Sequence, residues 1–221
     1  MRPVVKICGL MRVEDVQMCV RHGTDIVGFV VEYPRPVPWN LNLAQAKELI
    51  AAARKPAQTC VVTSAPNDAL RDHVFRIVEE TKPDYVQLHG DETLENTAHL
   101  VSELGKRKIK IIKALFPNTP DLEKTAAEFC KAGVYAILYD PRSPDSAHRG
   151  GAADLSVYQK LRAAVDCPVI LAGGITPENA AAIVRQTEAQ IIDLMTGVES
   201  DFGVKDEVTV VALFRALDEM K

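Results

Sequence analysis

Short apolar segments and longer segments of helical periodicity alternate along the whole of this 221-residue chain. Strands are predicted at Val4–Cys8, Ile26–Val31, Gln58–Val62, Tyr85–Leu88, Ile109–Ala114, Ala136–Tyr139, Val169–Ala172 and Ile191–Leu194. Helices are predicted at Glu14–Arg21, Leu43–Ala53, Asp68–Thr81, Leu94–Leu104, Leu122–Lys131, Leu155–Val165, Pro177–Gln186 and Val208–Met220. Because eight strand–helix units are the number that closes a barrel, the pattern predicts an α/β fold, a (β/α)8 TIM barrel.

The predicted strands are apolar almost throughout, as expected of a parallel sheet that is buried on both faces. An open, doubly wound sheet is the competing architecture, but the Gly-x-Gly-x-x-Gly fingerprint is absent after the first strand. No linker or change in composition interrupts the chain. We therefore expect residues 1–221 to form a single domain.

Composition and charge exclude several classes of function. The chain is 47% hydrophobic and 25% charged, with a net charge of −4, which is ordinary for a soluble globular protein. Its only basic run, residues 106–108, does not predict a nucleic-acid partner, and no apolar run is long enough to span a membrane. The five cysteines are widely spaced without a Cys-x-x-Cys pair, so we expect reduced thiols in a cytoplasmic protein.

Glycines follow the last two predicted strands. Gly173 and Gly174 precede a helix start at Thr176-Pro177, and Thr196-Gly197 follows the eighth strand. Glycine lets backbone N–H groups approach an anion, a helix N-terminus adds a favourable dipole, and barrels often hold phosphate at this place. We predict a phosphate site here; the alternative is that the paired glycines only permit a tight turn.

Two residues at strand ends could move protons. Cys8 ends the first strand before Gly9, and Asp140 ends the sixth strand before Pro141. A cysteine thiolate can act as a general base, and a carboxylic acid in a partly closed pocket can donate a proton. The alternatives are a buried cysteine that only packs and an aspartate that only caps a loop.

Two further polar residues lie at the same predicted end of the barrel. Arg35, in a proline-rich loop, has a guanidinium suited to a carboxylate, and His89, after the fourth strand, could donate to an anionic or carbonyl oxygen. A lone surface arginine and a structural histidine are the alternatives. No set of residues has the spacing of metal ligands, so no metal is expected.

Short segments along the chain are specific in combination. The most specific segments are Lys6-Ile7-Cys8-Gly9-Leu10, Gln87-Leu88-His89-Gly90 and Gly203-Val204-Lys205-Asp206. The others are Gly28-Phe29-Val30, Pro34-Arg35, Asp140, Gly150-Gly151, Leu171-Ala172-Gly173-Gly174-Ile175 and Thr196-Gly197-Val198-Glu199. Taken in order, these segments resemble the phosphoribosylanthranilate isomerase family of tryptophan biosynthesis over essentially the whole chain.

The resemblance implies an Amadori rearrangement that needs no cofactor. N-(5-phosphoribosyl)anthranilate would become 1-(2-carboxyphenylamino)-1-deoxyribulose 5-phosphate, with Asp140 as general acid and Cys8 as general base. Arg35 would meet the anthranilate carboxylate, and the backbones of Gly173, Gly174, Thr196 and Gly197 would hold the phosphate. Lys205 and Asp206 are interpreted as the start of the last helix, with Asp206 as its N-cap.

Several positions depart from the family pattern. Met11 replaces a small hydroxyl residue, Tyr33 replaces a serine, and Ala152-Ala153 stands where the family continues with Thr-Gly. The loop from Asp140 to Gly150 is slightly long and carries Arg142, Asp145, His148 and Arg149. Two alternatives therefore stay open: a diverged isomerase of another phosphorylated aminosugar, and a catalytically silent barrel that binds a phosphorylated ligand. The chain is expected to be a monomer or a homodimer.

Overall fold

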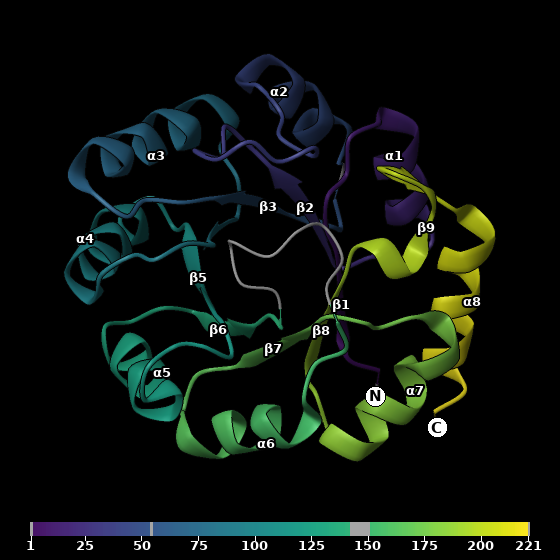
Figure 1. Cartoon of the computed structure of the whole chain (residues 1–221). Helices are drawn as coiled ribbons and strands as arrows, with labels where there is room; N and C mark the ends of the chain where they lie inside the picture. The colour runs from purple at the N-terminus through teal and green to yellow at the C-terminus, as the bar shows by residue number, and fades with distance from the viewer. Residues whose placement is uncertain (1, 54, 142–150, 221) are drawn as a thin grey trace.

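Parallel strands close into a barrel surrounded by helices (Figure 1). The computed structural model describes residues 2–53, 55–141 and 151–220. Five residues named in the sequence analysis lie outside the described residues: Arg142, Asp145, His148, Arg149 and Gly150. The barrel strands are β1 Val4–Ile7, β2 Ile26–Val30, β3 Gln58–Thr63, β4 Tyr85–Leu88, β5 Lys110–Leu115, β6 Ala136–Tyr139, β7 Val169–Ala172 and β8 Ile191–Leu194. Each strand pairs in parallel with its neighbours in chain order, and β1 pairs with β8.

Helices follow the strands and cover the outside of the barrel. They are α1 Val13–Arg21, α2 Leu43–Ala52, α3 Asp68–Thr81, α4 Leu94–Gly105, α5 Leu122–Lys131, α6 Leu155–Ala164, α7 Pro177–Thr187 and α8 Glu207–Asp218. Every predicted strand and helix is confirmed, and each end lies within two residues of its predicted position. None of the helices in the described ranges is both long enough and apolar enough to cross a membrane.

The apolar side chains of the barrel strands form two clusters, one outside the barrel and one inside it. Val5 and Ile7 on β1 point outward and join the core between the barrel and the helices. Cys8 points inward and joins the second cluster inside the barrel, as do Ala136 and Leu138 on β6. Successive side chains of a strand point to opposite faces, so residues of one parity face the interior.

A buried ion pair lies inside the barrel. Lys6 on β1 is the register partner of Asp193 on β8, and its Nζ atom lies 2.9 Å from the Asp193 Oδ2 atom. The Lys6 side chain is fully buried. Burial alone would lower the pKa of Lys6, but the adjacent Asp193 carboxylate outweighs it and raises the pKa, so this lysine stays charged. Since Lys6 and Cys8 share the inward parity of β1, the pair lies one layer below the cysteine.

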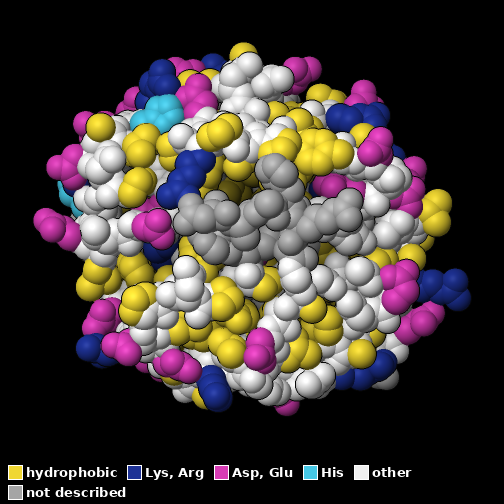
Figure 2. Space-filling model, viewed as in Figure 1, with side chains coloured by type: hydrophobic (Ala, Val, Ile, Leu, Met, Phe, Trp, Pro, Cys, Tyr) yellow, Lys and Arg dark blue, Asp and Glu magenta, His cyan; other side chains and the backbone are white. Residues whose placement is uncertain are grey.

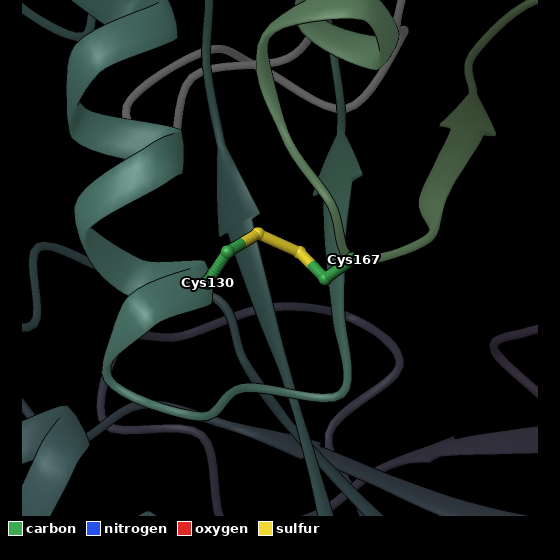
Figure 3. Close-up of a disulfide and its surroundings, with 2 residues drawn as sticks. All are labelled: Cys130 and Cys167. Atoms are coloured by element: carbon green, nitrogen blue, oxygen red, sulfur yellow. A yellow bond between two sulfur atoms is a disulfide. The ribbon is translucent and has the colours of Figure 1, made fainter.

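A disulfide joins α5 to the segment before β7 (Figure 3). Cys130 and Cys167 have Cα atoms 5.8 Å apart, a separation that suits a disulfide, so the prediction of five reduced thiols was wrong for these two. Cys8, Cys19 and Cys60 are free and buried. The bonded pair is 37 positions apart in the sequence and has no local motif; the packing of α5 beside α6, and of β6 beside β7, brings the end of α5 close to the start of β7.

An antiparallel hairpin that the sequence did not predict follows the barrel. After β8 come a short 3-10 helix, η1 Thr196–Val198, and the strands β9 Glu199–Asp201 and β10 Val204–Lys205. Lys205 therefore lies in the hairpin, and its predicted place at the start of the last helix was wrong. Asp206 is the N-cap of α8 as predicted, because its carboxylate accepts a hydrogen bond from the Thr209 N–H at 2.8 Å.

Candidate active site

Cys8 sits at the C-terminal end of β1 in a space that Gly28 leaves open. Its side chain points inward and the residue is only 6% exposed. Its backbone N–H donates to the Leu194 carbonyl at 2.8 Å, which continues the β1–β8 pairing. A Cβ atom added to Gly28 on β2 would lie 2.7 Å from the Cys8 Sγ atom, closer than real Cβ contacts. The missing side chain at Gly28 is what makes room for the thiol.

Asp140 and His89 meet at the same end of the barrel. Asp140 follows β6 with the inward parity of Leu138, and its side chain is 2% exposed. The His89 Nε2 atom, after β4, lies 3.7 Å from the Asp140 Oδ2 atom. The ring of Phe116 packs edge-on to the imidazole, with ring centroids 5.3 Å apart. The structure thus brings together two of the residues predicted for the site.

Gln87 sets the direction in which the His89 ring can donate. The Gln87 Nε2 atom lies 3.0 Å from the His89 Nδ1 atom. An amide nitrogen only donates, so with the amide in this orientation Nδ1 accepts and the proton of a neutral imidazole sits on Nε2. That proton faces Asp140, although the 3.7 Å between Nε2 and Oδ2 is longer than a hydrogen bond.

Arg35 lies at the rim, in the loop between β2 and α2. Its Nη2 atom is 3.8 Å from the Asp91 Oδ2 atom, and both side chains are largely exposed. An exposed ion pair of this kind contributes little and can be exchanged for another carboxylate. Tyr33 ties the same loop to the end of β4, because its hydroxyl donates to the His89 carbonyl at 2.6 Å.

The glycines predicted to hold phosphate lie where three loops meet. Gly173 and Gly174 both have positive φ angles, and a Cβ atom at Gly173 would lie 2.3 Å from the Pro141 side chain. A Cβ atom at Gly197, in η1, would lie 1.9 Å from the Ile175 carbonyl oxygen. Backbone conformation and close packing both require glycine here. Phosphate binding at these loops stays a prediction.

The helix after these loops begins as predicted. Thr176 is the N-cap of α7, Pro177 takes the first helical position, and the Asn179 side chain accepts a hydrogen bond from the Thr176 N–H at 2.8 Å. The N-terminal end of α7 therefore follows the Gly173-Gly174 turn directly. Within the described ranges, no group of three or more histidine, cysteine or acidic side chains is arranged to hold a metal ion.

Comparison with known proteins decides the family. Residues 5–216 match the family model described as N-(5'-phosphoribosyl)anthranilate (PRA) isomerase. The chain belongs to the PRA isomerase family.

The relatives agree in both sequence and structure. The chain is 35% identical to the N-(5'-phosphoribosyl)anthranilate isomerase of Acinetobacter calcoaceticus, covering 94% of this chain and 92% of that protein. It is 34% identical to the enzyme of that name from Haloferax volcanii, over 96% of this chain and 91% of that one. The crystal structure of phosphoribosyl anthranilate isomerase from Thermus thermophilus superposes with a TM-score of 0.80, at 30% identity and full coverage of both chains.

An aromatic pair, which the sequence analysis did not single out, joins two loops at the rim of this PRA isomerase family member. Trp39 in the β2–α2 loop and Phe202 at the tip of the hairpin have ring centroids 5.4 Å apart. Met11, one of the departures from the family pattern, packs beside them, since a Cβ atom at Gly203 would lie 2.8 Å from its sulfur. Apolar side chains are visible around the mouth in Figure 2. The available signal was a large aromatic residue in each loop, Trp39 after Pro38 and Phe202 after Asp201.

Proposed function

We propose that this chain converts N-(5-phosphoribosyl)anthranilate into 1-(2-carboxyphenylamino)-1-deoxyribulose 5-phosphate, with Cys8 and Asp140 as the proton-transfer residues. The observation that carries the proposal is that both side chains point inward at the C-terminal ends of their strands, within a chain of the PRA isomerase family. The C-terminal end is where barrels of this class place their chemistry. Proton transfer at two places on one sugar needs two groups at the same mouth.

The reaction needs one acid and one base, used in sequence. Asp140 donates a proton to the ribose ring oxygen, and the ring opens to an iminium ion. The iminium acidifies the adjacent C–H, so the Cys8 thiolate can remove that proton and leave an enolamine. The enolamine tautomerises to the ketone, so the product is an isomer of the substrate and no redox cofactor is consumed. The His89 imidazole lies beside this acid, with its Nε2 atom 3.7 Å from the Asp140 Oδ2 atom.

The two anionic ends of the substrate would be held on different elements. Arg35 would exchange Asp91 for the anthranilate carboxylate, and the backbone N–H groups of Gly173, Gly174, Thr196 and Gly197 would hold the phosphate beside the start of α7. The chain has a net charge of −4, so these local donors, and not the overall charge, would attract the substrate.

Steady-state kinetics with purified protein test the assignment. Cys8→Ala and Asp140→Asn should each lower kcat by about 10²–10⁴-fold, the usual contribution of a general acid or base, with a smaller effect on KM. Cys19→Ala, which alters a free cysteine on α1, outside the interior of the barrel, is the matched control and should keep kcat. Turnover that survives in both variants would refute the mechanism.

A second experiment tests the proposal against the alternatives that the sequence left open. Expression in a tryptophan auxotroph that lacks this isomerase should restore growth, and the two variants should not. If the unaltered protein binds a product analogue but shows no turnover, the silent-barrel alternative replaces the proposal.

We also propose that the protein acts in the cytoplasm as a single domain, as a monomer or homodimer. Sedimentation would distinguish the monomer from the homodimer.

A further inference from the structure

Lys205 is a buried lysine that the proposed mechanism does not use. It lies on β10, 4% exposed, and its Nζ atom is 2.6 Å from the Glu199 Oε1 atom. The same ammonium group donates to the Met195 carbonyl at 3.1 Å. Lysine is almost never buried so completely unless it is paired, because removing its charge from water is costly, so the partners of Lys205 define what it holds in place.

The two groups held by Lys205 flank the η1 turn. Met195 immediately precedes Thr196–Val198, and Glu199 immediately follows it. One ammonium group therefore binds both ends of the short turn. The backbone of the hairpin adds a further contact, because the Asp206 N–H donates to the Val198 carbonyl at 2.9 Å.

Holding the Met195 carbonyl also orients the next N–H group. The peptide bond between Met195 and Thr196 is trans, since the only cis bond among the described residues is at Lys55-Pro56. In a trans peptide the C=O and the following N–H point in opposite directions. The Thr196 N–H therefore points away from Lys205.

Lys205 is itself held in place from α1. The Asp15 carboxylate is buried, and its Oδ2 atom accepts a hydrogen bond from the Lys205 backbone N–H at 3.1 Å. Glu199 and Asp15 thus fix the side chain and the backbone of Lys205 separately. Contacts that over-determine a position are what a loop needs in order to present N–H groups in one geometry.

We infer that Lys205 is a positioning residue, which clamps both ends of the η1 turn so that the turn presents its backbone N–H groups to the substrate phosphate. The inference rests on the phosphate site proposed above. Lys205 does not touch the substrate in this arrangement. It acts through the Met195 carbonyl and the Glu199 carboxylate, and its loss should weaken phosphate binding more than chemistry.

The test compares Lys205→Met with the double variant Lys205→Met/Glu199→Gln. Substrate KM and the inhibition constant of inorganic phosphate should both rise about tenfold in each variant, with kcat changed by no more than about twofold. The double variant leaves no unpaired Glu199 charge, so it should be more stable than the single variant and yet keep the raised KM.

The matched control is Arg2→Met, which removes the Arg2–Asp25 ion pair at the opposite end of the barrel. It should lower stability without changing either constant. A folded double variant with the KM and phosphate inhibition of the unaltered protein overturns the inference, and so does a loss of kcat at constant KM. If the unaltered protein turns over substrate but inorganic phosphate does not compete, the proposed phosphate site fails, and the role of Lys205 fails with it.

Discussion

Replacing Gly28 with alanine tests whether the position of the Cys8 thiol limits the reaction. The added Cβ atom would lie 2.7 Å from the Cys8 Sγ atom and 3.2 Å from its Cα and Cβ atoms. The φ angle of Gly28 is not in the left-handed region, so alanine is compatible with the backbone there. The three atoms nearest to the new methyl group all belong to Cys8, and the Sγ atom is the closest of them.

The size of the effect follows from how far the thiol must move. An ordinary carbon–sulfur contact is roughly 1 Å longer than the separation that the variant would impose, because non-bonded carbon contacts are optimal at about 3.5–4.0 Å. A misplacement of about 1 Å costs about 100-fold in rate, or about 2.7 kcal/mol of transition-state stabilisation. Overpacking one methyl group should also cost about 1–3 kcal/mol of the free energy of unfolding.

The assay is kcat and KM with phosphoribosylanthranilate, accompanied by urea unfolding to show that the variant is folded. Gly28→Ala should lower kcat and leave KM close to its original value, because the anion-binding loops are untouched. Gly105→Ala is the control, since a Cβ atom at the end of α4 would meet nothing within 4 Å. A kcat within about threefold of the original in folded Gly28→Ala would refute the reasoning, because it would show that a displaced thiol serves equally well.

Three further predictions concern the disulfide, a buried carboxylate and the η1 turn. Reducing the Cys130–Cys167 bond, which spans 37 positions, should lower the free energy of unfolding by about 3–4 kcal/mol, with no such effect of reductant on a variant carrying serine at both positions. Burial alone would raise the pKa of Glu92, but the Lys113 ammonium and hydrogen bonds lower it below the unfolded value of about 4.3, so its contribution is present above that pH and is lost in acid. Urea unfolding should therefore show Glu92→Gln to be less stable than the unaltered protein at pH 7, by about 3 kcal/mol, and the difference should shrink below about pH 4. Gly197→Ala should raise KM about tenfold in steady-state kinetics, because its Cβ atom would lie 1.9 Å from a carbonyl oxygen of the neighbouring loop.

The barrel could be predicted because its signal is local. A strand such as Tyr85–Leu88 is short, apolar and followed by turn residues, and a helix such as Asp68–Thr81 has its own periodicity. The order of the units then determines the neighbours of each strand. The hairpin after β8 lacks such a signal, because its strands are only three and two residues long.

The residues that were misread depend on partners far away in the sequence. Lys205 was interpreted as the start of the last helix, but its backbone N–H donates to the carboxylate of Asp15, which lies near the other end of the chain. The Cys130–Cys167 pair likewise depends on the packing of α5 beside its neighbouring unit, which no local pattern reveals. Cys8, Asp140 and His89 were placed at one end of the barrel from strand ends alone, but the contact between His89 and Asp140 required the structure.

Strand pairing connects the proposed base to the proposed phosphate site. Cys8 continues β1, the η1 turn continues β8, and the two strands are held in register by Lys6 opposite Asp193 and by the Cys8 N–H on the Leu194 carbonyl. A phosphate held after β8 is therefore kept at a set distance from a thiol held after β1, without reliance on a flexible segment. The rim is built differently: Arg35 comes from a loop that is anchored at its start by a Tyr33 hydrogen bond, and Phe202 from a hairpin tip. Substitutions at the rim should therefore change which aryl group is accepted, whereas substitutions at β1 and β8 should change the proton-transfer step itself.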